Sequence, residues 1–234
     1  MSEGLSIIYE DNHLIAINKQ AGKLVQSDQT GDLSLEDQVK DFIRTRDSKP
    51  GNVFLGVSHR IDRPVSGVVV FAKTGKALTR LNEIFRQKEA VKKYWAIVKN
   101  KPVESSGTLK HYLSRDTIKN RTVVHEYPGK NTKEATLSYR IIGISDNYFL
   151  LEVILHTGRH HQIRAQLAKI ACPIKGDLKY GFPRSNKNGG ISLHARELSF
   201  IHPVKKEKIT IIAEPPANDL FNLFSPISDE NCSF

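Results

Sequence analysis

Residues 57–67, which read VSHRIDRPVSG, place one carboxylate among basic side chains. Asp62 lies between Arg60 and Arg63, and the segment leads directly into the apolar run VVVF at residues 68–71. A run of this kind predicts a buried strand, so the carboxylate would sit on the turn that enters the protein core. An isolated acid in this position needs a cationic partner.

A second segment supplies a candidate partner. Ile163, Leu167 and Ile170 recur at the spacing of one helical face, which must point to the core. Arg164 lies at the edge of this stripe and, half-buried, would need an anion, for which Asp62 is a candidate. A purely structural ion pair is the alternative. A carboxylate held by a buried arginine stays ionised, which suits a nucleophile or a base and not an acid.

Tyr94 lies in the segment VKKYWAIV, which predicts a strand over residues 91–98 that is buried on both faces. A tyrosine there is either a core residue or an aromatic wall, and an enzyme that flips a nucleobase out of its stack needs such a wall.

Other site chemistries fit the sequence less well. His156, His160 and His161 are close in sequence, but a glycine interrupts the helical spacing that would bring them together on a metal ion. His59 and His161 could act as acid and base of a phosphodiesterase. Ser66 lacks the context of a hydrolase nucleophile.

Composition sets the class of the protein. The chain has 234 residues, a formal net charge of +10 and a pI near 9.5, which favours a polyanionic partner. It has no charge-free apolar run approaching about 20 residues and no secretion signal, so a cytoplasmic location is expected. Cys172 and Cys232 form neither a disulfide framework nor a thiolate metal site.

The pattern of elements predicts an α+β fold in one domain over residues 1–234, with a core at about 7–213 and a loose tail at about 225–234. No Gly-rich phosphate loop is present. A capping box at Ser34 opens a helix that runs to Arg46, and further helices are predicted at 76–87, 160–170 and near 218–224. Strands are predicted at 6–9, 14–17, 68–72, 91–98, 108–113, 121–125, 135–144, 148–155 and 208–213, with a hairpin at 191–202.

Several ordered blocks resemble the signature motifs of the RluA-type RNA pseudouridine synthases. They are HRIDRPVSGVVVFAKT from residue 59, KKY from 92, LHTGRHHQIR from 155 and PIKGDLKYG from 173. The opening IIYED and NKQAG, with the late LHA and HP, extend the likeness over about residues 7–213. Any one block alone would be weak, but their common order makes the resemblance specific.

The resemblance implies the family's fold, a mixed, largely antiparallel sheet flanked by helices with a central RNA-binding cleft. It implies that Asp62 is the catalytic aspartate, Tyr94 the tyrosine against the target base, and Arg164 the basic partner of Asp62. We further expect substrate contacts at His59, Arg60, Lys92, Arg159, His161 and Leu193. From the basic composition we also expect a phosphate-binding surface that includes Arg60, Arg159, Lys175, Lys179, Lys205 and Lys206.

The expected reaction is the isomerisation of uridine to pseudouridine in ribosomal or transfer RNA, by a monomer without metal or cofactor. Asp62 could attack C1′ or C6, or assist a glycal route. Pro64-Val65, Ala165-Gln166 and Gln20 depart from the family's common residues, which leaves the target RNA open. A non-catalytic RNA-binding or ribosome-assembly module and a uracil-releasing glycosylase remain as alternatives.

Overall fold

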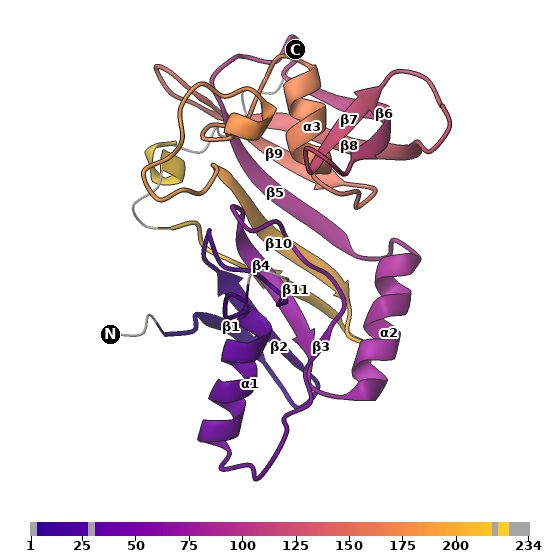
Figure 1. Ribbon diagram of the computed structural model, residues 1–234, viewed down its shortest axis with the longest axis vertical. Helices are drawn as coiled ribbons and strands as arrows, with labels where there is room; N and C mark the ends of the chain where they lie inside the picture. The colour runs from indigo at the N-terminus through magenta and orange to yellow at the C-terminus, as the bar shows by residue number, and fades with distance from the viewer. Residues whose placement is uncertain (1–3, 28–30, 217–219, 225–234) are drawn as a thin grey trace. The chain divides into compact units, whose positions relative to one another are not determined.

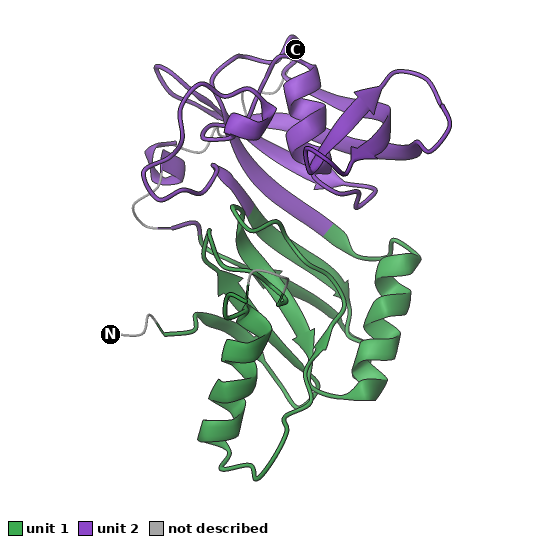
Figure 2. Cartoon of the chain, in the orientation of Figure 1, with its two compact units in different colours: residues 1–91, 195–214 green, residues 92–194, 215–234 purple. Residues whose placement is uncertain are grey.

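The computed structural model describes residues 4–27, 31–216 and 220–224, and the chain divides into two compact units. Figure 2 shows unit 1, residues 1–91 and 195–214, and unit 2, residues 92–194 and 215–234. The prediction of a single domain over residues 1–234 stays a prediction, and the expected loose tail at 225–234 lies outside the described residues.

Unit 1 is a layer of antiparallel strands with two helices (Figure 1). Its strands follow the order β1-β2-β4-β10, with β3 also paired to β4 and β11 to β10. The part of β10 from Ala195 onward belongs to this unit. The elements are β1 Ile7–Glu10, β2 Leu14–Lys19, α1 Leu35–Arg46, β3 Gly56–Val57, β4 Ser66–Ala72, α2 Gly75–Arg86, β10 Leu193–Ile201 and β11 Lys208–Ile212.

All seven residues of β4 are buried, which explains its apolar run from Val68 to Ala72. Val68 and Val70 join a core cluster with Leu81 and Ile84 of α2, so one face of β4 is covered by that helix. α1 begins at the predicted capping box, in which the Ser34 side chain accepts from the Asp37 N–H and the Asp37 carboxylate accepts from the Ser34 N–H. These caps satisfy N–H groups that the first helical turn leaves without partners.

Unit 2 is an antiparallel sheet in the order β5-β9-β8-β6-β7, and α3 packs against β6 and β7 (Figure 1). A second apolar cluster joins Ile97, Leu150 and Phe221. The elements are β5 Val91–Val98, β6 Ser106–Asp116, β7 Arg121–His125, β8 Lys133–Ile144, β9 Phe149–Leu155, α3 Gln162–Lys169, and the 3-10 helices η1 Leu178–Tyr180 and η2 Leu220–Leu223.

The predicted fold class, a largely antiparallel sheet with few helices, is confirmed. The hairpin predicted at residues 191–202 is wrong, because residues 193–201 form one strand, β10, which pairs with β11 across a turn beginning at His202-Pro203. β5 is not buried throughout: Val91 is exposed and residues 92–95 are partly exposed. Within the described ranges, none of the helices has the length and apolar character needed to cross a membrane.

Candidate active site

Asp62 lies on the connection between β3 and β4 in unit 1. Ile61 and Val65, on either side of it, are buried with exposures of 7% and 2%, whereas Asp62 is partly exposed. The N–H of Val65 donates to the Asp62 carbonyl at 3.0 Å, which closes a turn. The buried side chains of Ile61 and Val65, together with this turn, therefore hold the Asp62 carboxylate at the surface of a packed segment.

His59 fixes the start of the same turn. Its Nε2 accepts a hydrogen bond from the N–H of Val70 at 2.9 Å, and its ring lies 4.9 Å from the ring of Phe85. The imidazole is thus used to hold the turn against β4 and α2. Arg60 is exposed. Contacts of His59 and Arg60 with a substrate stay predictions.

Lys19 is a functional candidate that our sequence reasoning missed. Its side chain is buried, with an exposure of 1%, and its Nζ donates to the carbonyls of Gln20, Lys23 and Arg63 at 2.8–3.1 Å. Burial lowers the pKa of Lys19 to about 7, while the nearby Asp62 carboxylate acts in the opposite direction. Lys19 therefore ties the residue after Asp62 to β2 and places a cation near the carboxylate. The sequence signal that could have revealed Lys19 was a lysine at the end of the apolar strand LIAINK.

Tyr94 lies on β5 in unit 2 and pairs with Val153 of β9, which in turn pairs with Tyr139 of β8. The side chain is partly exposed, in contrast to Ala96 and Ile97 further along the strand, which are fully buried. An aromatic ring at the transition between exposed and buried strand suits a wall that a base can stack on.

Arg164, on α3 of unit 2, is buried, with an exposure of 4%. Its Nε and Nη2 donate to the two carboxylate oxygens of Asp177 at 2.7 and 2.9 Å, and its guanidinium lies 5.1 Å from the ring centre of Tyr180. Bidentate pairing fixes both the position and the plane of a guanidinium. Two donor groups of Arg164 are therefore held by Asp177, a residue to which we assigned no role from sequence although it lies in the motif PIKGDLKYG.

His161 adjoins Arg164 at the start of α3 and adopts a left-handed backbone with φ of 48°. Its Nδ1 lies 2.9 Å from the Tyr180 hydroxyl, which accepts from the N–H of Thr122 at 2.7 Å. Burial, followed by the charges of Arg164 and other nearby cations, lowers the pKa of His161 to about 2. The ring is neutral at physiological pH, so it can only exchange hydrogen bonds here, not act as a charged group.

The other side chains that we predicted to contact the substrate differ in their burial and in their hydrogen-bond partners. Burial lowers the pKa of Lys92, and Leu193 is buried with an exposure of 3%. Arg159 donates to the Glu134 carbonyl at 3.1 Å, and Lys175 to the Asn186 amide at 2.6 Å. Roles of these side chains in binding a substrate stay predictions.

Lys205 has a partner in its own unit. Its Nζ lies 3.1 Å from Oδ2 of Asp11, and Oδ1 of the same carboxylate accepts from the N–H groups of His13 and Leu14. Lys205 therefore neutralises a carboxylate of unit 1, and its predicted contact with phosphate would have to compete with this ion pair.

Each of the histidines that suggested a metal has its own hydrogen-bond partner, and the rings of His160 and His161 stack with their centroids 3.7 Å apart. His156 contacts the Ser138 hydroxyl at 2.8 Å, His160 contacts the Thr122 hydroxyl at 3.1 Å, and His161 contacts Tyr180. In the described ranges of the chain no group of three or more His, Cys, Asp or Glu residues could hold a metal ion.

Comparison with known proteins identifies the family. The family model described as RNA pseudouridylate synthase matches residues 13–169, which span the Asp62 turn, Tyr94 and Arg164. An RNA pseudouridine synthase of Synechocystis is 37% identical over 92% of this chain and 66% of its own length. The ribosomal large subunit pseudouridine synthase C of Rickettsia typhi is 32% identical over 90% and 68%, and the tRNA pseudouridine synthase C of Vibrio parahaemolyticus is 31% identical over 89% of each. The chain thus spans about two thirds of the first two relatives.

A solved structure supports the same assignment. The human RNA pseudouridylate synthase domain containing 4 is similar with a TM-score of 0.76 and 25% identity, over 91% of this chain and 89% of that one. The family and fold expected from the ordered sequence blocks are confirmed. The chain belongs to the RluA-type RNA pseudouridine synthases, enzymes that isomerise uridine to pseudouridine in RNA.

Proposed function

We propose that this chain converts uridine to pseudouridine in structured ribosomal or transfer RNA, with Asp62 as the carboxylate that attacks or stabilises the reacting sugar and base. Tyr94 supplies the wall against the flipped base, and Arg164 is the basic partner of Asp62. The proposal rests on family membership and on the construction of the Asp62 turn.

That turn is the observation that carries the assignment of Asp62. Buried neighbours, the Val70–His59 hydrogen bond and the Lys19 ammonium at the Arg63 carbonyl all fix the backbone around one partly exposed carboxylate. Catalytic groups need this pre-organisation, because small displacements of a reacting atom cost large factors in rate.

The chemistry needs no oxidant and no energy source. The bond from N1 of uracil to C1′ of ribose breaks, the base turns, and C5 bonds to the same C1′; C5 then loses its proton and N1 gains one. A carboxylate can form a covalent intermediate at C1′ or C6, or can stabilise a glycal-type species after loss of the C2′ proton. Each route uses one ionised carboxylate beside the base.

The relatives indicate two RNA classes, since one is named for the large ribosomal subunit and another for transfer RNA. The 2′-hydroxyl of the target distinguishes RNA from DNA. Mapping pseudouridines in ribosomal and transfer RNA from cells with and without this gene identifies the class. A pseudouridine that is absent from cells without the gene, and returns when the wild-type protein is expressed again, marks the target uridine.

The variant Asp62→Asn tests the catalytic assignment. It is nearly isosteric and removes one negative charge, so pseudouridine formation should be abolished while RNA affinity stays within a few fold. Asp41→Asn, at an exposed residue of α1, is the matched control and should be fully active. Turnover by Asp62→Asn, with mass spectrometry excluding deamidation back to aspartate, would show that the carboxylate is not required.

A further inference from the structure

A group of cations surrounds the turn between β6 and β7 in unit 2. Asn120 lies in this turn with a left-handed φ of 42°. The guanidinium of Arg115 donates to its side-chain oxygen at 3.3 Å, and the ammonium of Lys179 donates to its backbone carbonyl at 3.0 Å. We name the group Arg115, Lys119, Asn120, Arg121 and Lys179 the Asn120 cluster.

The charges in the Asn120 cluster are poorly compensated. Asp116, which adjoins the cluster, accepts from the N–H of Lys119 at 2.9 Å and lies 3.8 Å from Nε of Arg121. In the part of the chain that the structure describes, neither Arg115 nor Lys179 forms an ion pair with a carboxylate. Both are held by neutral amide oxygens, which fix their positions and leave their positive charge available.

The same two cations act on a neighbouring group. Arg115 and Lys179 both contribute to lowering the pKa of His161, after burial and the charges of Arg164 and His160. The positive charges of Arg115 on β6 and Lys179 on η1 thus both act at the His161 ring. Like charges repel, so a protein that fixes them together gains from an anion that binds between them.

Two exposed apolar side chains accompany these cations. Ile118 precedes Lys119 and is 96% exposed, and Leu178 precedes Lys179 and is 57% exposed. Exposed apolar side chains next to cations suit a nucleic acid, in which phosphates alternate with sugars and unstacked bases. A purely ionic ligand would give Ile118 and Leu178 nothing to contact.

We propose that the Asn120 cluster binds the phosphodiester backbone of a segment of the substrate RNA, with Ile118 and Leu178 against its sugars or bases. This deepens the proposed function and rests on it, because the segment belongs to the RNA that the enzyme modifies. Arg115 and Lys179 are the main phosphate ligands, and Asn120 is the residue that positions them.

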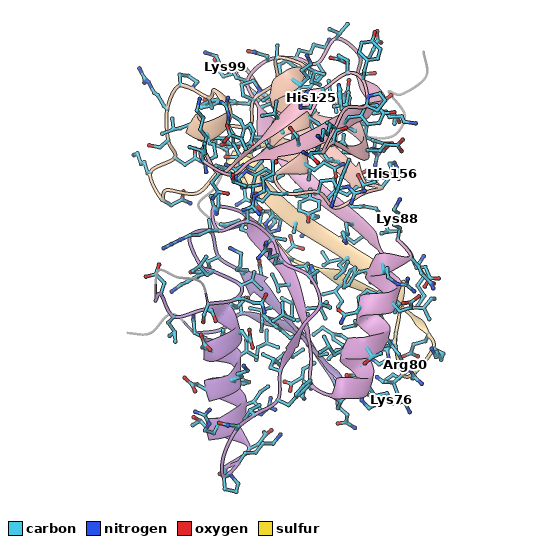
Figure 3. The ribbon with its side chains drawn as sticks, turned by 45° about the vertical axis from the view of Figure 1, so that its right-hand side comes forward. Lys76, Arg80, Lys88, Lys99, His125 and His156 are labelled. Atoms are coloured by element: carbon cyan, nitrogen blue, oxygen red, sulfur yellow. The ribbon has the colours of Figure 1, made fainter. Side chains whose placement is uncertain are left out.

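The double variant Arg115→Gln/Lys179→Gln tests the proposal. The matched control is Lys99→Gln/Lys101→Gln, which removes two exposed cations from the connection after β5 in the same unit; Lys99 is labelled in Figure 3. The probe is an unmodified transcript of large-subunit ribosomal RNA. Its affinity is measured between about 50 and 200 mM salt, where each lost single-strand phosphate contact flattens the log–log slope by about 0.7.

We expect the slope of the Arg115→Gln/Lys179→Gln variant to flatten by about 1.4, for two lost contacts, and its KM to rise. Arg115→Lys/Lys179→Arg, which retains both charges, should recover most of the slope, and Ile118→Ser should raise KM several-fold without changing the slope. An unchanged slope in the Gln variant, or an equal change in the control pair, would overturn the proposal. Thermal melting of each variant establishes that it is folded.

Two further readouts separate the possible causes of failure. If wild-type enzyme binds the transcript but forms no pseudouridine in any RNA, the proposed function fails. If it forms pseudouridine and the Gln variant binds RNA as well as wild type does, only the Asn120 cluster proposal fails. Binding of polyglutamate that is lost in the Gln variant, together with unchanged RNA binding, would assign the surface to an acidic protein and contradict an RNA site.

Discussion

Arg164 shows how much a single side chain of the candidate site depends on its neighbours. Asp177 occupies two of its donor groups and is 1% exposed, so the pair is fully desolvated. Removing one partner of a buried pair leaves the other charge without compensation. Asp177 therefore fixes the position of the Arg164 guanidinium.

Asp177→Asn should destabilise the protein by about 3–5 kcal/mol, because it replaces the buried carboxylate that accepts from Nε and Nη2 of Arg164 with a neutral amide. Urea unfolding measures the loss. The double variant Arg164→Gln/Asp177→Asn removes both charges and should recover part of it. A single Asp177→Asn variant with the wild-type unfolding midpoint would mean that the pair contributes nothing to stability.

His161 gives the protein a pH dependence of defined sign. Burial, with the adjacent cations, lowers its pKa to about 2, whereas an unfolded chain has the ordinary histidine pKa of about 6.5. Between these values the unfolded state binds the additional proton, so stability falls as pH decreases below about 6.5. The slope is at most about 1.4 kcal/mol per pH unit, less the part screened by solvent at this partly exposed ring.

His161→Asn should remove this contribution, and asparagine tolerates the left-handed backbone at this position. The variant should lose less stability than wild type between pH 7 and pH 5 when both are unfolded with urea. Equal losses in the two proteins would show that His161 does not titrate differently in the folded and unfolded states.

At the scale of elements, two strands approach each other closely at one glycine. Gly67 in β4 has φ of 116°, and a Cβ there would lie 2.2 Å from the carbonyl oxygen and 2.6 Å from the nitrogen of Ala195 in β10. Backbone atoms cannot move aside as a flexible side chain could. Gly67 therefore sets the distance between these two strands directly after the Asp62 turn.

Gly67→Ala should cost about 3 kcal/mol or more, from backbone strain and the clash with Ala195 together. Gly75→Ala is the matched control, because no atom lies within 4 Å of its added Cβ and Gly75 opens α2. It should leave stability unchanged or raise it slightly. Equal melting temperatures for the two variants would contradict this view of β4.

At the scale of the whole molecule, the positive charge is unevenly distributed along the chain. Residues 92–194 contain 18 Lys and Arg residues against 7 Asp and Glu. Unit 1 carries basic residues as well, including Lys76 and Arg80 on α2 and Lys88 just after it (Figure 3), but it balances them with nearly as many acids. Salt should therefore weaken RNA binding mainly through residues of unit 2.

Lys205→Ala tests this distribution. Lys205 is exposed and pairs with Asp11, so its removal should lower stability only slightly and should leave the salt dependence of RNA binding unchanged. Lys208→Ala, at the exposed start of β11, is the control for loss of one unit 1 charge. If the dependence of RNA affinity on salt becomes weaker in Lys205→Ala but not in Lys208→Ala, Lys205 contacts an RNA phosphate.

Much of this molecule could be predicted from local sequence. The Ser34 capping box, the strand at 68–72 and the helical spacing around Arg164 each depend on neighbouring residues and were predicted correctly; the observed strand begins two residues earlier, at Ser66. Asp177 and Lys19 were missed because their roles depend on partners far away in sequence or on backbone carbonyls, which composition does not reveal. β10 was misread as a hairpin because the apolar pattern of residues 191–202 does not show that the turn comes after it.

The discontinuity of unit 1 has a consequence for synthesis of the protein on the ribosome. Strand β4 is made early, but its neighbour β10 follows only after the whole of residues 92–194. At ordinary rates of translation this interval lasts on the order of 10 s. During it the edge of β4 that pairs with β10 is covered only at Phe71 and Ala72, by β3, and the rest of this edge is open to wrong pairing. We infer that the sheet of unit 2 closes first and that the part of the enzyme carrying Asp62, although synthesised earlier, is completed last.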